Sequence, residues 1–246
     1  MDHLGYRKKF GVLGPSTNTI VQPDFDDLRV RGVTNHYSRI IIPNNPVTDN
    51  ESFLKLVGAI NGATLDAVDV LKTCEMDYLV MGMSAATFWD GRKGAEKYLA
   101  MMKDRAGVGV SCGSFAMEAA LNVYKVKRIA FLSPYFPVAN EQVRRFFEDC
   151  GFTVVRDVCL RRPSPVLIAH ATDAQCRDAI RQLDGDDVEA IVQVGTNLSM
   201  MRLAAAAELF LGKPVIAINT ATYWHALRAC GIEDRVEGYG NLMEHH

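Results

Sequence analysis

The chain has 246 residues, of which 48% are apolar and 23% charged, and its formal net charge is −2. This length and composition are those of an ordinary soluble globular protein with a full hydrophobic core, in one large domain or two smaller ones. The small net charge gives no indication of a nucleic-acid or membrane partner, and no apolar run approaches the roughly 18 residues of a membrane span.

The six cysteines are scattered and form neither a CxxC pair nor a metal-ligand cluster. In a chain of this size the pattern is typical of reduced thiols, and the charged first residues lack the apolar stretch of a signal peptide. We therefore expect a cytoplasmic protein. No glycine-rich phosphate loop and no metal spacing of His, Asp or Glu is found, so we expect no cofactor and no metal.

Short apolar runs alternate with stretches of helical periodicity along the whole chain, which predicts an α/β fold with parallel sheets. We predict strands at residues 9–13, 36–42, 77–80, 107–110, 127–132, 152–155, 191–194 and 214–218. We predict helices from residue 23, at 49–60, 65–74, 93–103, 115–123, 140–147, 172–183 and 200–211, and one ending at residue 230. Asn140, and either Thr172 or Asp173, have the short polar side chains that favour helix N-caps.

Three sequence landmarks occur twice, at offsets of 119, 112 and 106 residues. They pair Gly14-Pro15 with Ser133-Pro134, Met83-Ser84 with Gly195-Thr196, and Gly113-Ser114 with Asn219-Thr220. Repetition at this spacing indicates two related α/β halves and not a solenoid. We predict two pseudo-symmetric Rossmann-like halves, each a parallel sheet flanked by helices. The first comprises residues 1–118 and 220–246, and the second residues 119–219.

Two loops rich in small and hydroxyl-bearing residues follow predicted strands at corresponding places in the halves. Residues 81–87 follow the strand at 77–80, and residues 195–199 follow the strand at 191–194. In open α/β sheets, ligands bind beyond the carboxyl ends of the strands. We therefore predict one site, in the cleft between the halves, to which both loops contribute.

These motifs resemble the Asp/Glu racemase superfamily, in the branch that contains maleate cis-trans isomerase and arylmalonate decarboxylase. The similar segments are residues 14–19, 81–91, 127–143, 195–198 and 236–240, which follow the family's order over nearly the whole chain. The resemblance implies cofactor-independent chemistry on a small-molecule carboxylate or related carbonyl compound, through an enolate-like intermediate. It also implies a possible homo-oligomer.

By the same resemblance, pre-aimed hydrogen-bond donors hold the substrate carboxylate and the enediolate that it becomes. The positions predicted to bind substrate are Ser16, Asn18, Met83, Ser84, Tyr135, Gly195, Thr196 and Asn197. The amide of Asn197 also suits a neutral carbonyl, so the ligand need not be a dicarboxylate.

The chain departs from the family at the two positions where racemising and isomerising members carry cysteines. These positions are Met83 and Gly195, and neither residue can transfer a proton. The sequence therefore favours a lyase- or decarboxylase-like or hydrolase-like reaction over two-thiol racemisation. The alternative is a degenerate homologue that binds a small carboxylate without turnover.

Two other residues are candidates for the acid or base, and we predict both as catalytic. Cys112 precedes a predicted helix N-terminus, which lowers a thiol pKa, although free cysteines are often plain buried residues. Tyr135 is a candidate acid, with a structural hydroxyl as the alternative. Four further side chains each have two interpretations, a structural role, which is the simpler one, and a role in the site. They are His36, Arg39, Phe88 and Trp89.

Overall fold

The computed structural model describes residues 2–246, in which two four-stranded sheets have the neighbour orders β2-β1-β3-β4 and β6-β5-β7-β8. The first sheet consists of β1 (Lys8–Pro15), β2 (Val33–Ile40), β3 (Tyr78–Met81) and β4 (Gly109–Ser111). The second consists of β5 (Arg128–Ser133), β6 (Thr153–Cys159), β7 (Ala190–Gln193) and β8 (Val215–Ala217). All the strand pairs are parallel. The second order repeats the first, and the predicted α/β fold of two parallel sheets is confirmed.

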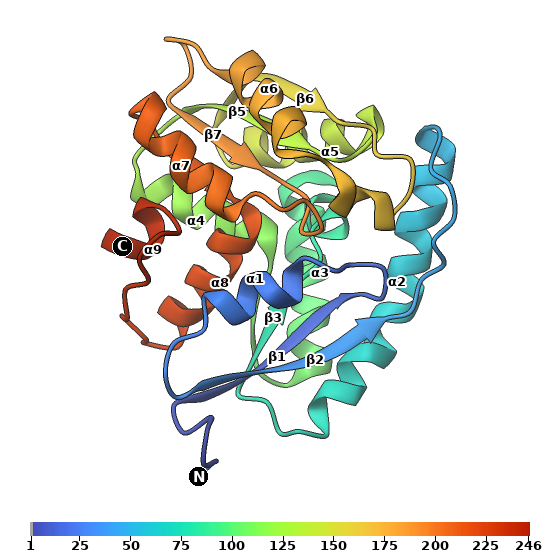
Figure 1. Cartoon of the computed structure of the whole chain (residues 1–246). Helices are drawn as coiled ribbons and strands as arrows, with labels where there is room; N and C mark the ends of the chain where they lie inside the picture. Colours follow the sequence, from blue (N-terminus) through green and yellow to red (C-terminus); the bar gives the residue numbers. More distant parts are fainter. Residues whose placement is uncertain (1) are drawn as a thin grey trace.

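Helices flank both sheets, with the first sheet in the lower part of Figure 1 and the second in the upper part. The α-helices are α1 (Val21–Asp27), α2 (Asn50–Lys72), α3 (Gly91–Ala106), α4 (Gly113–Val123), α5 (Pro137–Asp149), α6 (Asp173–Leu183), α7 (Met201–Leu211), α8 (Ile218–Ala229) and α9 (Asn241–His245). Two 3₁₀ turns are η1 (Ala85–Phe88) and η2 (Val166–His170).

The long helix α2 replaces the two helices predicted at 49–60 and 65–74. Its buried stripe continues through the predicted break, where the Thr64 hydroxyl donates to the carbonyl of Ile60 at 2.6 Å. Gly58 and Gly62 face open space, so each weakens the helix by only about 1 kcal/mol. The prediction of two helices is wrong because packing of the stripe outweighs this local preference.

Two predicted helix caps have different outcomes. Thr172 is the N-cap of α6, and its side chain and that of Gln175 form a reciprocal capping box, as expected. Asn140 caps nothing, because α5 already begins at Pro137. The buried Asn140 amide instead accepts from the Ser133 hydroxyl and donates to Asp157 at 2.7 Å, which ties α5 to β5 and β6.

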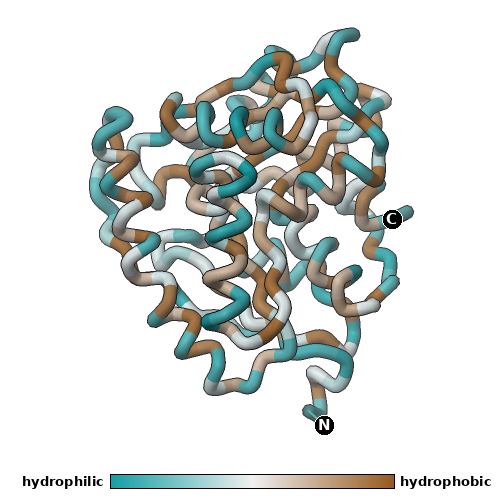
Figure 2. Tube along the Cα trace, turned by 180° about the vertical axis from the view of Figure 1, so that it is seen from behind, coloured by the Kyte–Doolittle hydropathy of each residue, from teal (hydrophilic) through white to brown (hydrophobic). Residues whose placement is uncertain are grey.

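Helices α4 and α8 pack against each other, and α8 contacts β3 and β4 of the first sheet as well as β8 of the second. One core cluster contains buried residues of both halves, among them Phe10 and Phe131. The division of the chain at residues 118/119 and 219/220 stays a prediction. Along the chain, short apolar stretches alternate with hydrophilic ones (Figure 2), and no helix within residues 2–246 has both the length and the apolar character needed to cross a membrane.

Candidate active site

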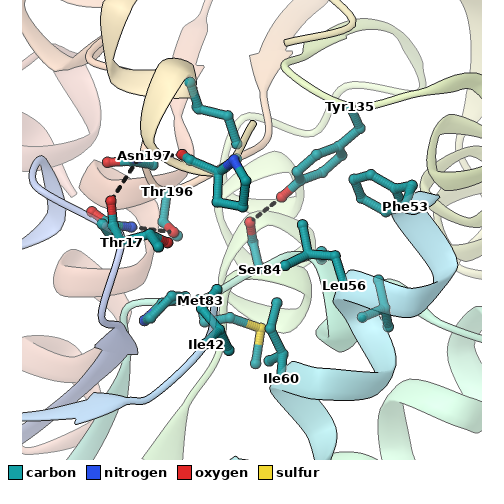
Figure 3. A pocket seen from close by; sticks show the side chains of 17 residues that line it. Thr17, Ile42, Phe53, Leu56, Ile60, Met83, Ser84, Tyr135, Thr196 and Asn197 are labelled. Atoms are coloured by element: carbon teal, nitrogen blue, oxygen red, sulfur yellow. Dashed lines mark hydrogen bonds between the residues drawn. The ribbon is translucent and has the colours of Figure 1, made fainter. Parts of the chain in front are cut away.

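A cavity lies in the cleft between the halves, next to the ends of β1, β3, β5 and β7 (Figure 3). Its volume is ≈ 60 Å³, well above the roughly 10–15 Å³ that a cavity needs to hold one water molecule. Its polar lining side chains are Thr17, Asn18, Ser84, Tyr135, Thr196 and Asn197. Its apolar wall includes Ile42, Phe53, Leu56, Val57, Ile60, Met83 and Ile168.

The structure brings seven of the eight predicted substrate-binding residues to this cavity. Ser16 is the exception, since its hydroxyl donates to the carbonyl of Ile42 and accepts from the amide of that residue, at 3.3 and 3.1 Å. Ser16 therefore joins the chain beyond β1 to the chain beyond β2. Ser16 is exposed and lies outside the cavity lining, so its place in the site stays a prediction.

Ser84 and Tyr135 face each other across the cavity, and their hydroxyl oxygens are 2.7 Å apart (Figure 3). Ser84 follows β3 of the first sheet, and Tyr135 follows β5 of the second. Both side chains are buried, and the ring of Phe53 packs on that of Tyr135 with 5.4 Å between centroids. Burial raises the pKa of Tyr135 well above its usual value, so this phenol stays protonated and able to donate.

Several backbone N–H groups of both loops are left without an acceptor. In the second loop, the amide of Leu198 donates to the carbonyl of Gly195, which closes a tight turn over residues 195–198. The amide N–H groups of Ser84, Thr196 and Asn197 have no acceptor anywhere in residues 2–246. Unengaged N–H groups in a buried cleft can bind an anion without first breaking bonds within the protein.

The side chains of Asn18, Thr196 and Asn197 hold the two halves together. The Thr196 hydroxyl donates to the carbonyl of Gly82 and accepts from the Asn18 amide, both at 3.0 Å. The Asn197 amide accepts from the backbone N–H of Thr19 at 2.9 Å and donates to the carbonyl of Pro165 at 2.9 Å. These three side chains are already engaged in hydrogen bonds, which leaves the backbone N–H groups, the Ser84–Tyr135 pair and the Thr17 hydroxyl as the donors for a ligand.

The apolar wall of the cavity was not foreseen from the sequence. Phe53, Leu56, Val57 and Ile60 of α2 form most of it, and η2 adds Ile168 from the other half. The helical spacing of these side chains predicts a buried face but does not distinguish a core from a cavity wall. The distinction depends on how the second half packs on α2, which is set by residues far away in the sequence.

Cys112 lies outside the cavity lining, in the apolar core of the first half. Burial raises the pKa of this thiol, so the expected lowering by the helix N-terminus is wrong. Its sulfur is 3.5 Å from the Ser114 hydroxyl, and only 2% of the residue is exposed. A neutral thiol enclosed in this way fits the alternative interpretation, a plain buried cysteine.

The other four candidates also lie outside the cavity lining. The His36 ring bonds to the Thr34 hydroxyl at 2.9 Å. The Arg39 guanidinium donates to the carbonyl of Asn18 at 2.7 Å and so supports the segment that follows β1. Phe88 is fully buried, and Trp89 packs against the same core. Their structural interpretations fit these positions.

Gly195 has a backbone geometry that favours glycine. Its φ is +108°, and a Cβ built on it would lie 2.4 and 2.6 Å from the ring carbons Cδ and Cγ of Pro134. Real Cβ contacts are not this short. The Pro134 ring therefore occupies the space that a side chain at position 195 would need.

The second loop is also tied to α1 through Asn219 at the start of α8. The Asn219 amide donates to the carbonyl of Thr196 at 3.0 Å and to the carboxylate of Asp24 at 2.7 Å. Burial raises the pKa of Asp24 to about 6, and the neighbouring Asp27 adds to the rise while Asn219 and Arg202 oppose it.

Replacing Asp24 by asparagine is expected to stabilise the protein at neutral pH by about 2–3 kcal/mol. With a pKa of about 6 against an ordinary 3.8, the folded protein keeps a proton that the unfolded chain loses. The stability of the natural chain therefore falls as the pH rises from about 4 to 6. Urea unfolding should show the Asp24→Asn advantage growing across this window, with exposed Asp186→Asn as control. An advantage independent of pH would contradict the assignment.

The lining of the cavity contains no carboxylate, imidazole, thiol, amine or guanidinium group. Within residues 2–246, no three or more His, Cys, Asp or Glu side chains are placed to hold a metal ion. Hydroxyl groups are thus the proton donors among the lining side chains, with the Tyr135 phenol ordinarily the most acidic of them, and the site offers no ordinary base.

Solved structures of other proteins share the architecture of this chain. In structure, the chain is similar to the maleate cis-trans isomerase of Nocardia farcinica, with a TM-score of 0.87, 20% identity and coverage of 96% of this chain and 98% of that one. It is also similar to an arylmalonate decarboxylase variant, with a TM-score of 0.79, 18% identity and coverage of 97% and 100%.

In sequence, the chain is 32% identical to the maleate isomerase of Pseudomonas putida over 130 residues, 52% of either chain. The matched part of this chain therefore spans about half the length of that relative. The family model for arylmalonate decarboxylase matches residues 53–243, which include the first loop, Tyr135 and the second loop. The chain belongs to the arylmalonate decarboxylase and maleate isomerase family of the Asp/Glu racemase superfamily.

Proposed function

We propose that this protein is a cofactor-independent decarboxylase of a small malonate-type acid. One observation carries the proposal. The cavity combines unengaged amide N–H groups and the Ser84–Tyr135 hydroxyl pair with an apolar wall, and its lining contains no base. Among the reactions that pass through an enolate, decarboxylation is the one whose first step needs no base.

The reaction follows from the placement of these groups. One carboxylate of the substrate accepts hydrogen bonds from the N–H groups of Ser84, Thr196 and Asn197. The second lies against the apolar wall, where loss of hydration favours its departure as CO₂. The electrons of the broken C–C bond pass to the α-carbon and spread into the retained carboxylate, forming an enediolate that the N–H groups stabilise. Tyr135 then protonates the α-carbon and regains its proton from water.

Racemisation, isomerisation and hydrolysis fit the site less well. Racemisation must remove a proton, and hydrolysis must activate water, so both need a base that the lining lacks. A cysteine variant of the N. farcinica isomerase holds a covalent succinylcysteine intermediate. The resemblance assigns the family's thiols to positions that are Met83 and Gly195 here, and neither residue can form such an adduct.

The direct test incubates the purified protein with methylmalonate, phenylmalonate and maleate and follows the products by NMR. We expect loss of CO₂ from a substituted malonate and no fumarate from maleate. The ≈ 60 Å³ volume of the cavity favours the methyl over the phenyl substituent. Formation of fumarate would contradict the proposal, because it needs chemistry that this lining does not supply.

A second candidate function is carboxylate binding without turnover. It is favoured by Met83 and Gly195, which place no proton-transferring group at either family position. A rise in melting temperature with malonate or maleate, and no product after long incubation of either, would support binding alone. Such a result would overturn the decarboxylase proposal while keeping the site.

A further inference from the structure

The peptide units of the second loop are held from behind by buried side chains. The Gly195 carbonyl accepts a hydrogen bond from the Gln193 amide at 2.8 Å. The Thr196 carbonyl accepts one from the Asn219 amide at 3.0 Å. In a planar trans peptide, the C=O and the following N–H point in opposite directions. Holding the Gly195 and Thr196 carbonyls therefore fixes where the N–H groups of Thr196 and Asn197 point.

Both supporting amides are themselves firmly placed. The side-chain oxygen of Gln193 accepts from the backbone N–H of Ile218 at 3.3 Å, and the Asn219 nitrogen uses its second hydrogen on Asp24. Gln193 is 1% exposed and Asn219 2%. Neither lines the cavity, so neither can touch a ligand there.

The first loop has a corresponding support. The Thr87 hydroxyl donates to the carbonyl of Ser84 at 2.8 Å, and this peptide unit carries the N–H of Ala85, a lining residue. Thr87 is likewise buried and outside the lining. A side chain from behind thus holds a carbonyl in both loops, although the supporting residues differ in type.

We propose that Gln193 and Asn219 are positioning residues, which aim the N–H groups of Thr196 and Asn197 into the cleft as donors for an anionic ligand. This role rests on the proposed function, since it assumes that the donors meet a carboxylate. Pre-aimed donors stabilise developing charge because they need no reorganisation when that charge appears. Without the two amides, the turn at 195–198 keeps its closing bond but loses the fixed tilt of its peptide planes.

The test uses Gln193→Met and Asn219→Leu, which keep the side-chain volume roughly constant and remove the donor. Asn35→Leu is the matched control, because the Asn35 amide holds the carbonyl of Phe25 at 3.2 Å, away from the cavity. If a variant fails to fold, Gln193→Ser and Asn219→Ser keep a polar group that is too short to reach the carbonyl. The probe is malonate alone.

Two measurements separate this role from the proposed function. Amide hydrogen exchange needs no ligand, and we expect the segment 195–198 to exchange faster in both variants but not in the control. The malonate dissociation constant should rise about 10- to 100-fold in the variants, the loss expected for hydrogen bonds to a charged group.

The two outcomes that would overturn the inference differ. Unchanged exchange at 195–198 in both variants overturns the positioning role, whatever happens to malonate. Faster exchange in a protein that binds no malonate even in its natural form overturns the proposed anion site, and the positioning role with it. Faster exchange together with weaker malonate binding, both absent from Asn35→Leu, supports the inference.

Discussion

Replacing Tyr135 by phenylalanine is expected to reduce kcat for decarboxylation by about 10²- to 10⁴-fold, the usual contribution of a positioned general acid. The hydroxyl of Tyr135 is the one phenol in the lining, whose other hydroxyls are the far less acidic alcohols of Ser and Thr side chains, and it is hydrogen-bonded to that of Ser84. Removing it leaves the enediolate without its most acidic proton donor of the protein. Because Phe53 still packs on the ring, the fold should lose only about 1 kcal/mol.

The control for this variant is Tyr124→Phe. The Tyr124 hydroxyl is buried and unpaired within residues 2–246, and it lies outside the cavity. Steady-state kinetics and urea unfolding should show a large kinetic effect for Tyr135→Phe alone. Full activity of Tyr135→Phe would mean that the proton comes from elsewhere, and the proposed mechanism would fail.

The pH profile provides an independent check on Tyr135. Because burial raises the pKa of Tyr135 well above its usual value, the phenol does not lose its proton on the alkaline side of neutrality. We expect kcat to stay constant from about pH 7 to pH 9. A loss of activity in this range that disappears in Tyr135→Phe would show that the phenol titrates there.

The sequence predicts the fold well because its signals are local. Strand ends are marked by residues such as Gly14, Ser133 and Gly195, and repeated landmarks reveal the two halves. The same signals lead to the two loops and to Tyr135. Prediction failed where a distant contact decides the outcome. The break that the sequence predicts within α2 is absent because the buried stripe of the helix packs along its whole length. The pKa of the Cys112 thiol is raised because the core encloses it.

The chemistry of the site was harder to predict than its place. Hydroxyl and amide side chains in the loops suggested direct substrate ligands, yet the side chains of Thr196 and Asn197 bond across the cleft to Gly82 and Thr19. Apart from hydroxyls such as the Ser84–Tyr135 pair, the donors left for a ligand are backbone N–H groups, which every sequence has. Their availability depends on where side chains such as Gln193 and Asn219 place the carbonyls, and a one-dimensional pattern does not contain this information.

Restoring a thiol at position 195 is expected to destabilise the protein by about 3 kcal/mol or more and to give no racemase activity. The +108° φ of Gly195 costs a residue with a side chain about 1–3 kcal/mol, and overpacking against Pro134 costs a similar amount. Urea unfolding of Gly195→Cys measures the sum. Gly107→Cys is the matched control, because its φ is +71° and nothing lies within 4 Å of the new Cβ.

The double variant Pro134→Ala with Gly195→Cys separates the two contributions to the loss of stability, the backbone strain at position 195 and the steric clash with Pro134. Removing the proline ring should recover the steric part and leave the backbone strain, so the two substitutions should be coupled by about 1–3 kcal/mol. If Gly195→Cys is no less stable than Gly107→Cys, then Pro134 does not block the position. Racemase activity of Gly195→Cys combined with Met83→Cys would show that the site lacks only its thiols. The clash with Pro134 indicates instead that the second loop requires glycine at position 195, and that a cysteine fits there only if the Pro134 ring is removed.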